Sequence, residues 1–433
     1  MKNRNTKKGG QAIIIAVLFF LFFISLIVYG AANPIMHRIQ VATDFFQSQS
    51  GFYLSEAKLE DLLYRMKNSK QYSSFETLTL NGNTASTTIV QNGTGKVITA
   101  SGIVGATVRQ TQASVSQTSG LSYGIQVGGG GLSMSNSSSV TGNIFSNGPI
   151  SGSGNSITGD AVSASSTGSI TNIKVGGDAR AHVITNSTVG GNAYYSSISG
   201  TTVTGTSNPN TIDTTPISFP ITDTVITALE QSALAGGTYS GSCPYDPASG
   251  TIIGPIYIAC TTSPAMRLDN NGTFTFKGNV WVAGDIDIGS GNVTYVIDPS
   301  IGAKSVAIIA HKASNTSTGS KITVTNSPVF QNSGVAGSYI VFISQNNSKE
   351  LGGTNKAITI SQSSSGEVVY YAAHGLIDVS NSITARALAG YGVATSQKAN
   401  LNLTYQSSLG SILFQDGPPA TYTVQTQNWK EIQ

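Results

Sequence analysis

The hydrophobic positions near the start of the chain form one uninterrupted run. Residues Ala12 to Ala32 are 21 residues without a charge. At about 1.5 Å rise per residue, a helix of this length spans roughly 31 Å, the thickness of the hydrocarbon core of a bilayer. The residues before it carry four basic side chains: Lys2, Arg4, Lys7 and Lys8. By the positive-inside rule we expect a single-pass membrane helix, with a cytoplasmic N-terminus and an extracytoplasmic C-terminal bulk.

A cleaved secretory signal is the alternative for this segment. The apolar core of such a signal is usually about 7–15 residues, and a small-x-small cleavage site follows it. The run here is longer, and residues 33–36, Asn-Pro-Ile-Met, offer no convincing site. The pattern therefore favours a retained membrane helix, with the lipid bilayer as its partner.

Helical patterning continues beyond the apolar run. Phe45, Phe52, Leu59 and Met66 recur every seven residues, with charged residues between them. This spacing predicts an amphipathic extension with a packing seam, so that residues 11–72 form one long helix. Pro34 and Gly51 are expected to kink and weaken it. A signal anchor followed by a coiled-coil stalk is the alternative.

The pattern changes after about residue 80 to short β-prone runs between Gly, Asn and Ser. A glycine followed by Asn or Asp recurs at intervals of 17, 18 and 14 residues, in 142–143, 159–160, 177–178 and 191–192, and residues 278–279 and 284–285 echo it. One such interval matches one coil of a parallel β-helix, with Val and Ile inward and polar residues outward. We therefore predict a β-helical repeat region over 80–206. A Gly/Ser/Thr-rich β chain that is not a solenoid is the alternative.

Residues 207–265 interrupt this pattern. Three prolines predict an extended crossing, and Thr222 or Asp223 caps a short helix that Gly236-Gly237 ends. We expect the helix to brace the side of the solenoid or to cap one end, with a linker as the alternative. Residues 266–433 read as further strands that continue the solenoid or form a separate β-sandwich. The fold class is α+β, a long N-terminal helix followed by a mostly β ectodomain.

Charge is scarce and unevenly placed. Only 10% of the residues are charged, and 14 of the 43 charges fall in the first 80 residues. No basic stripe is available to neutralise phosphates, which argues against a nucleic-acid binder. The low charge also argues, less strongly, against an ordinary cytosolic enzyme.

The chain has two cysteines, Cys243 and Cys260. Both lie outside the membrane in the predicted topology, where disulfides persist. A bridge between them would close a loop of about 18 residues and stabilise by roughly 3 kcal/mol. A pair of free buried thiols is the alternative, and no His or further Cys lies nearby to complete a metal site.

Candidate catalytic residues are few. The four histidines, His37, His182, His311 and His374, stand in unrelated contexts, and we expect the last three to be solvent-facing or turn residues. Asp285 and Asp287 are two apart on a predicted strand and point to one face, as do the carboxylates of some β-helix enzymes that act on sugars. For these, and for Asp160 and Asp178, a turn or surface role is the stronger expectation.

The glycine run 128–131 is expected to be a flexible turn, since no Lys-Ser/Thr follows to make a phosphate loop. Together these patterns predict no catalytic site, no cofactor and no metal.

The N-terminal region resembles a known class of bacterial proteins. A short basic leader ends in Gly9-Gly10, a hydrophobic helix beginning Gln11-Ala12-Ile13 follows, and Phe52-x-x-x-Glu56-Ala57 lies further along. These features resemble the class III signal of type IV pilin-like proteins, and more closely the PilX-type N-terminal domain of pilus assembly proteins. Residues 429–431, Trp-Lys-Glu, add a weaker likeness at the C-terminal end.

The resemblance implies that residues 1–10 are a leader, which a prepilin peptidase removes after Gly10 to leave Gln11 first. Cleavage after Gly9 is the second choice. It also implies other pilin-like subunits as partners. Major pilins carry a Glu as the fifth residue after the cut, where this chain has Ile15. The departure favours a minor or accessory subunit of a type IV pilus-type system, displayed at the cell surface or in a pilus and used in adhesion.

Two other functions remain open from the sequence. One is a plain membrane-anchored adhesin or stalk without pilus machinery. The other is a polysaccharide-active β-helix enzyme that uses Asp285 and Asp287.

Overall fold

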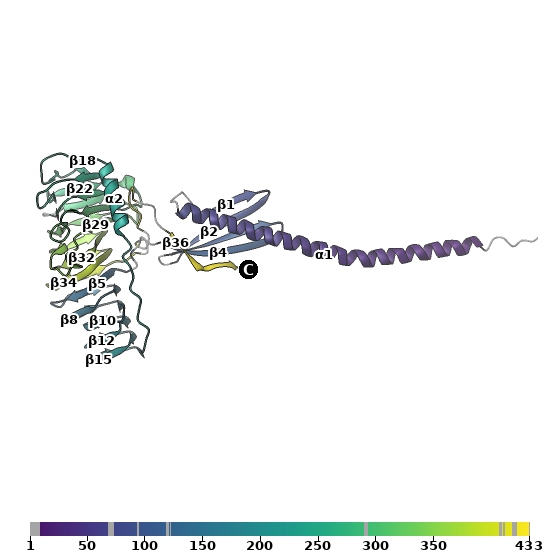
Figure 1. Cartoon of the computed structure of the whole chain (residues 1–433), viewed down its shortest axis with the longest axis horizontal. Coiled ribbons are helices and arrows are strands. Elements are labelled where there is room, and N and C mark those ends of the chain that lie inside the picture. The colour runs from purple at the N-terminus through teal and green to yellow at the C-terminus, as the bar shows by residue number, and fades with distance from the viewer. Residues whose placement is uncertain are drawn as a thin grey trace, which may run out of the picture. The chain divides into compact units, whose positions relative to one another are not determined.

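The computed structural model describes residues 9–67, 73–92, 95–117, 121, 123–289, 293–406, 409, 412–417 and 422–432. The chain divides into two compact units. The first, the helix–sheet unit, holds the N-terminal helix, the first four strands and the last strand; the second, the ladder unit, spans residues 116–423. A long apolar helix followed by a large β-rich region agrees with the predicted α+β class (Figure 1).

Helix α1 (Gly9–Lys67) is a single helix of 59 residues that passes through Pro34. All side chains from residue 13 to residue 46 are exposed. Further along, one side of the helix is buried, and Leu59 and Met66 of the predicted seam are at most 1% exposed. Phe45, at 59% exposed, lies outside that buried part. The predicted end of the helix, residues 68–72, lies outside the described residues.

Five strands make up the sheet of the helix–sheet unit. Their order in the sheet is β1 (Phe75–Leu80), β2 (Asn83–Asn92), β3 (Gly95–Val104), β4 (Thr107–Gln117) and β36 (Tyr422–Ile432). Strands β1 and β2 are antiparallel, with Leu80 opposite Asn83. Asn81 and Gly82 between them have φ of 50° and 76°. Positive φ at both positions is what a two-residue type I′ hairpin turn requires.

The helix meets the sheet at two glycines. A Cβ atom on Gly102 would lie 2.1 Å from the backbone oxygen of Gly51. Only glycine permits such an approach of two backbones. Gly51, which the sequence marks as a weak point of the helix, is therefore where α1 lies against β3.

The last strand completes this sheet from the far end of the sequence. Strand β36 pairs beside β4, and Arg109 of β4 lies 3.3 Å from Glu431. The division of the chain thus differs from the predicted one. Residues 80–92 and 96–115, assigned to the repeat region, and residues 424–432, assigned to the C-terminal β region, belong to the helix–sheet unit. Pairing between strands so distant in sequence leaves no local pattern.

The ladder unit consists of parallel strands in three ladders. The first ladder runs in the order β18 (Thr238–Tyr239), β20 (Ile256–Ile258), β23 (Val280–Val282), β26 (Val306–Ala310), β29 (Ile340–Ser344), β32 (Val368–Val379), β34 (Ala387–Thr395), β5 (Ile125–Met134), β7 (Ile144–Ser146), β9 (Ala161–Ser163), β11 (Ala179–Arg180), β14 (Ala193–Tyr195) and β17 (Ser207–Pro209).

The second ladder shares β32, β34 and β5 with the first, through their C-terminal halves. Its other strands are β21 (Met266–Leu268), β24 (Ile286–Ile288), β27 (Ile322–Val324), β30 (Lys356–Ile360), β8 (Ile150–Ile157), β10 (Ser169–Val175), β12 (Val183–Thr185) and β15 (Ser197–Ser199).

The third ladder includes the ends of β8 and β10. Its other strands are β19 (Ile252–Ile253), β22 (Gly272–Phe276), β25 (Val293–Ile297), β28 (Val329–Gln331), β31 (Ser364–Gly366), β33 (Ile383–Ala385), β35 (Asn400–Leu403), β6 (Ser139–Thr141), β13 (Thr188–Val189) and β16 (Thr202–Val203). In sequence order the strands fall on the first, second and third ladder in turn, and we call one such passage a circuit.

The circuits do not stack in the order of the sequence. Leu388 of β34 pairs with Ile125 of β5, so the last circuit of the unit lies on its first (Figure 1). The chain starts in the middle of the stack, descends to β17, crosses to the opposite end at β18 and returns to the middle. The amide of Leu121 donates to the carbonyl of Leu409 at 2.8 Å, which brings the two ends of the ladder unit together.

The glycine run 128–131 is part of β5 rather than a flexible turn. It lies where this strand passes from the first ladder to the second. A Cβ atom on Gly128 would lie 3.0 Å from the Cα of Tyr391 on the neighbouring strand. The glycines therefore permit close packing of two backbones.

The return crossing and the short helix cover the outer face of the first ladder. Residues 210–222 run along it, with Asn147 donating to the carbonyl of Ile217 at 2.7 Å. Helix α2 (Asp223–Ala235) follows, and Thr222 caps it as predicted. Its Ile226 and Leu229 form a second hydrophobic cluster with outward side chains of β26, β29 and β32. The helix predicted as a brace thus packs on the side of a ladder. A separate 3₁₀ turn, η1 (Pro299–Ile301), lies between β25 and β26.

The repeated Gly-Asn/Asp phrase marks one corner of successive circuits. The side-chain oxygen of Asn143 accepts from the amide of Asp160, that of Asp160 from Asp178, and that of Asp178 from Asn192, at 2.7–2.9 Å. The position before each Asn or Asp has no room for a side chain, since a Cβ atom on Gly177 would lie 2.2 Å from the Asp160 carboxylate. The turn role expected for Asp160 and Asp178 is the one observed.

Candidate functional site

The exposed half of α1 carries a long run of exposed apolar side chains. Ile13, Phe20 and Tyr29 are 66–76% exposed. Within the part of the chain that the structure describes, α1 is the one helix long and apolar enough to cross a membrane, and its most apolar window is not buried. Isolated apolar patches of this size are uncommon on soluble proteins, which makes this surface the first candidate for a function.

The predicted processing site lies at the start of this helix. Gly9, Gly10 and Gln11 fall in the first turn of α1, and residues 1–8 of the predicted leader lie outside the described residues. Ile15, which stands where a major pilin has Glu, is 64% exposed. An apolar side chain at this depth carries none of the cost of placing a carboxylate in lipid.

The family-like motif lies where α1 begins to pack. Phe52 and Glu56 are half-buried and Ala57 is exposed. The ring of Phe52 lies 5.8 Å from that of Tyr53. The structure thus places the three residues at the edge of the helix–sheet contact and does not gather them into one site.

Charged residues beside this motif fasten the helix to the sheet. Lys58, almost fully buried, lies 3.2 Å from Glu76 of β1, and Arg65 also binds Glu76. The hydrogen bond from Arg65 is the main reason why the pKa of the Glu76 carboxyl falls to about 2. The clustering of charge in the first 80 residues is a sequence signal of this network, but that signal does not identify which residues pair.

Each histidine of the ladder unit is partly exposed, at 24–35% of its side chain, and lies against a carboxylate that the expectation of solvent-facing or turn residues did not include. His182 is 3.0 Å from Asp213 of the crossing, and His311 is 2.5 Å from Glu230 of α2. Residue His37 is on the exposed half of α1. The first two pairs join residues 210–235 to the ladders. The two residues of each pair are far apart in sequence, so no local motif predicts the pairing.

His374 binds two carboxylates. Its Nδ1 lies 2.6 Å from Glu350 and its Nε2 3.1 Å from Asp223 at the start of α2. Burial alone would lower the pKa of His374, but the hydrogen bonds to Asp223 and Glu350 outweigh it and raise that pKa above 6.5. His374 thus joins the start of α2 to the loop before β30.

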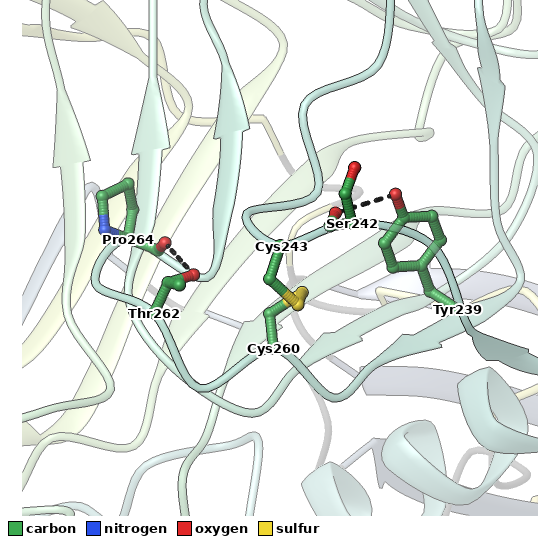
Figure 2. Close-up of a disulfide and its surroundings, with 6 residues drawn as sticks. All are labelled: Tyr239, Ser242, Cys243, Cys260, Thr262 and Pro264. Atoms are coloured by element: carbon green, nitrogen blue, oxygen red, sulfur yellow. Dashed lines mark hydrogen bonds between the residues drawn. A yellow bond between two sulfur atoms is a disulfide. The ribbon is translucent and has the colours of Figure 1, made fainter.

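The predicted disulfide between Cys243 and Cys260 is confirmed, with a Cα–Cα distance of 5.5 Å. It closes a loop that begins after β18 and ends after β20, at the β18 end of the ladders. Figure 2 shows the bond beside Tyr239 and Ser242. The hydroxyl of Tyr239 donates to the carbonyl of Ser242 at 3.0 Å, and the rings of Tyr239 and Tyr245 meet at 4.7 Å. Tyr245 belongs to the inner core, so this loop covers the end of that core.

The carboxylates of Asp285 and Asp287 have separate surroundings. Asp285 accepts from the amide of Lys321 at 2.9 Å and from the hydroxyl of Ser263 at 2.8 Å, which is the same corner role as Asp160. Asp287 stands in register with Arg267 on the outer face of the second ladder. Burial raises the pKa of Asp287, and the charge of Arg267 opposes that rise.

Neither carboxylate faces the cavity of about 500 Å³ that lies beside Pro299, Phe330 and Gly334. Among the described residues there is also no group of three His, Cys, Asp or Glu side chains that could hold a metal ion.

Comparisons with known proteins add one finding. No protein-family model and no curated protein matches the chain. A solved structure that resembles it is the competence-associated pilin ComZ from Thermus thermophilus, at 10% identity and a TM-score of 0.35, covering 89% of this chain and 97% of that one. A TM-score this low describes a distant likeness and does not bear on function.

Proposed function

We propose that the chain is a pilin-like structural protein, a minor or accessory subunit of a type IV pilus-type assembly system. The observation that carries this proposal is the division of α1. Its first half is apolar and exposed directly after a basic leader ending in Gly9-Gly10, while its second half packs on the sheet that begins with the antiparallel strands β1 and β2. A helix of this kind is anchored in lipid by one half and carries a folded unit with the other.

The ladder unit is then the displayed part, and its strands support a parallel β-helix. Strands pair in parallel with the equivalent strand of the next circuit, and inward Val and Ile alternate with outward Ser and Thr. Parallel pairing of this regularity favours a solenoid over the β-sandwich, whose sheets are antiparallel.

The proposed role is structural rather than enzymatic. Asp285 is engaged at a corner, Asp287 lies beside Arg267 on the second ladder, and the histidines of the ladder unit bind carboxylates of the crossing, α2 and the loop before β30. The partners would be the bilayer, a prepilin peptidase and other pilin-like subunits, and the site of action the inner membrane or the cell surface. Adhesion is the use that a polar and sparsely charged outer face suits.

The test is the N-terminus of the native chain. N-terminal sequencing of protein purified from membranes should begin at Gln11. Gly10→Leu should retain Met1. Gly9→Leu should still begin at Gln11 if the peptidase cuts after Gly10, and should retain Met1 if it cuts after Gly9. Gly30→Leu is the matched control, because Gly30 lies on the same helix with open space around it, and it should leave processing unchanged. A wild-type chain that begins at Met1 would rule out pilin-like processing and leave the plain membrane-anchored adhesin.

A further inference from the structure

The two ends of the stacked ladders are built differently. At the β18 end, the disulfide-closed loop places Tyr245 over the inner core, and Tyr245 is 9% exposed. At the other end stand β15, β16 and β17, which we call the open end. Among the strand pairings of the described residues, each of these strands pairs with one neighbour: β12, β13 and β14 respectively.

The open end presents backbone and apolar side chains together. In a parallel ladder alternate residues direct their N–H and C=O groups to opposite sides, so an outermost strand leaves half of these groups without a strand partner. Ile198 and Val203 are the last inward side chains and are only partly buried. Ile212, just beyond β17, is 89% exposed.

The usual protection of edge strands is slight here. Natural edge strands are commonly blocked by charged side chains, especially Lys, or by proline. From residue 183 to residue 212 the chain has 30 residues without one Asp, Glu, Lys, Arg or His. Pro209, at the end of β17, is the one such device in this stretch. Two such surfaces can meet without like-charge repulsion.

The shape of the open end selects its partner. Strands β15, β16 and β17 are 3, 2 and 3 residues long. An extended peptide added to one of them would gain at most three paired residues, far fewer than peptide recognition by strand addition ordinarily uses. Only a second three-sided end covers all three strands at once. The β18 end of another copy is closed by its disulfide loop, so the only matching surface on that copy is its own open end.

We propose that the open end is an interface between two copies of this chain, which meet end to end about a two-fold axis. Such an axis makes the contact isologous, with the same patch on both copies, and it sets the facing strands antiparallel. The pair would bury Ile198, Val203 and Ile212 of each copy. This inference depends on the strand pairings and not on the pilin-like role, so end association and N-terminal processing can fail separately.

Cross-linking of the full chain in its membranes tests the interface. Both native cysteines are paired, so a single introduced cysteine is the only free thiol. Ser197→Cys, Thr202→Cys and Ser207→Cys place one on each exposed edge strand. With a short bis-maleimide, at least one of them should yield a product of twice the chain mass. Leu351→Cys, on a loop before β30 and 69% exposed, is the control and should yield none.

A charge at the interface should abolish that product. Ile212→Lys, combined with the reactive cysteine, is expected to remove the doubled band, and so is Thr204→Lys at another exposed position of the open end. Leu351→Lys should leave the band unchanged. All three substitutions are at exposed positions, and an unaltered thermal unfolding curve verifies the fold. Absence of a doubled band from all three cysteine variants, its survival in both lysine variants, or a band joined to a different protein would overturn the proposal.

Discussion

The two units of this protein are stabilised by different means. In the helix–sheet unit the buried cation Lys58, together with Arg65, is tied to Glu76, and hairpins such as Asn81-Gly82 set the strand register locally. In the ladder unit the register comes from stacked corners, where an Asn or Asp side chain of one circuit accepts from the amide of the next. The comparison teaches that the first unit should respond to pH and salt, whereas the second should respond to small changes of side-chain volume.

The largest effect is expected from emptying the inner core of the ladder unit. Phe330 is 1% exposed, and its ring lies 5.3 Å from Tyr295 and 5.5 Å from Phe342. Phe330→Ala should destabilise this unit by about 3–5 kcal/mol, since it removes buried area and leaves a cavity. Val329→Ala on the same strand, 39% exposed, should cost no more than about 0.5 kcal/mol. Thermal unfolding of the two units measures both; equal effects of the two substitutions would contradict the inner core described here.

A methyl group at a corner should have the next largest effect. Gly177→Ala places a Cβ atom against the Asp160 carboxylate and should destabilise the ladder unit by about 1–3 kcal/mol through overpacking. Lys174→Ala, exposed on the preceding strand, is the control. The stability of the ladder unit in both variants is measured by denaturant unfolding with tryptophan fluorescence, since Trp281 is in this unit. An unchanged midpoint for Gly177→Ala would show that the corners do not set the register.

The helix–sheet unit should lose stability in acid. The folded-state pKa of Glu76, about 2, lies below its ordinary value of 4.5. The stabilisation is therefore fully present above about pH 4.5 and is lost as the pH falls towards 2. Because solvent screens part of the interaction, Glu76→Gln should cost about 1–2 kcal/mol at pH 7 and remove this pH dependence. A thermal melt of the helix–sheet unit that shifts equally with pH in both proteins would contradict the network.

The smallest effect concerns His374 in the ladder unit. Its pKa is raised on folding, so the stabilisation is present below pH 6.5 and is lost as the pH rises through the folded-state pKa. His374→Gln should cost less than about 1 kcal/mol, and only in that lower pH range. His37→Gln on α1 is the control. A loss of stability that is the same at pH 5.5 and pH 9 would mean that the ring packs without its charge.

Local patterns were sufficient for much of this fold. Residues Ala12 to Ala32 predicted the apolar half of α1, the Gly-Asn/Asp phrase predicted the corners, and Thr222 with Gly236 bounded α2. Each of these rests on residues close together in sequence.

The features that the sequence did not predict depend on distant segments. Strand β36 joins β4, and Leu388 of β34 pairs with Ile125 of β5. The carboxylate partners of the histidines come from the crossing, from α2 and from the loop before β30. Short polar strands are compatible with many partners, so periodicity alone could not choose among them.

We propose that α1 lies in a membrane and that the ladder unit lies on the outer side of that membrane. Leu351→Cys, exposed in the ladder unit, tests both parts in one measurement with a membrane-impermeant maleimide on intact spheroplasts. The account predicts labelling without permeabilisation, on a chain that stays with the membranes after a carbonate wash. Labelling only after permeabilisation, or a chain recovered in the soluble fraction, would contradict it.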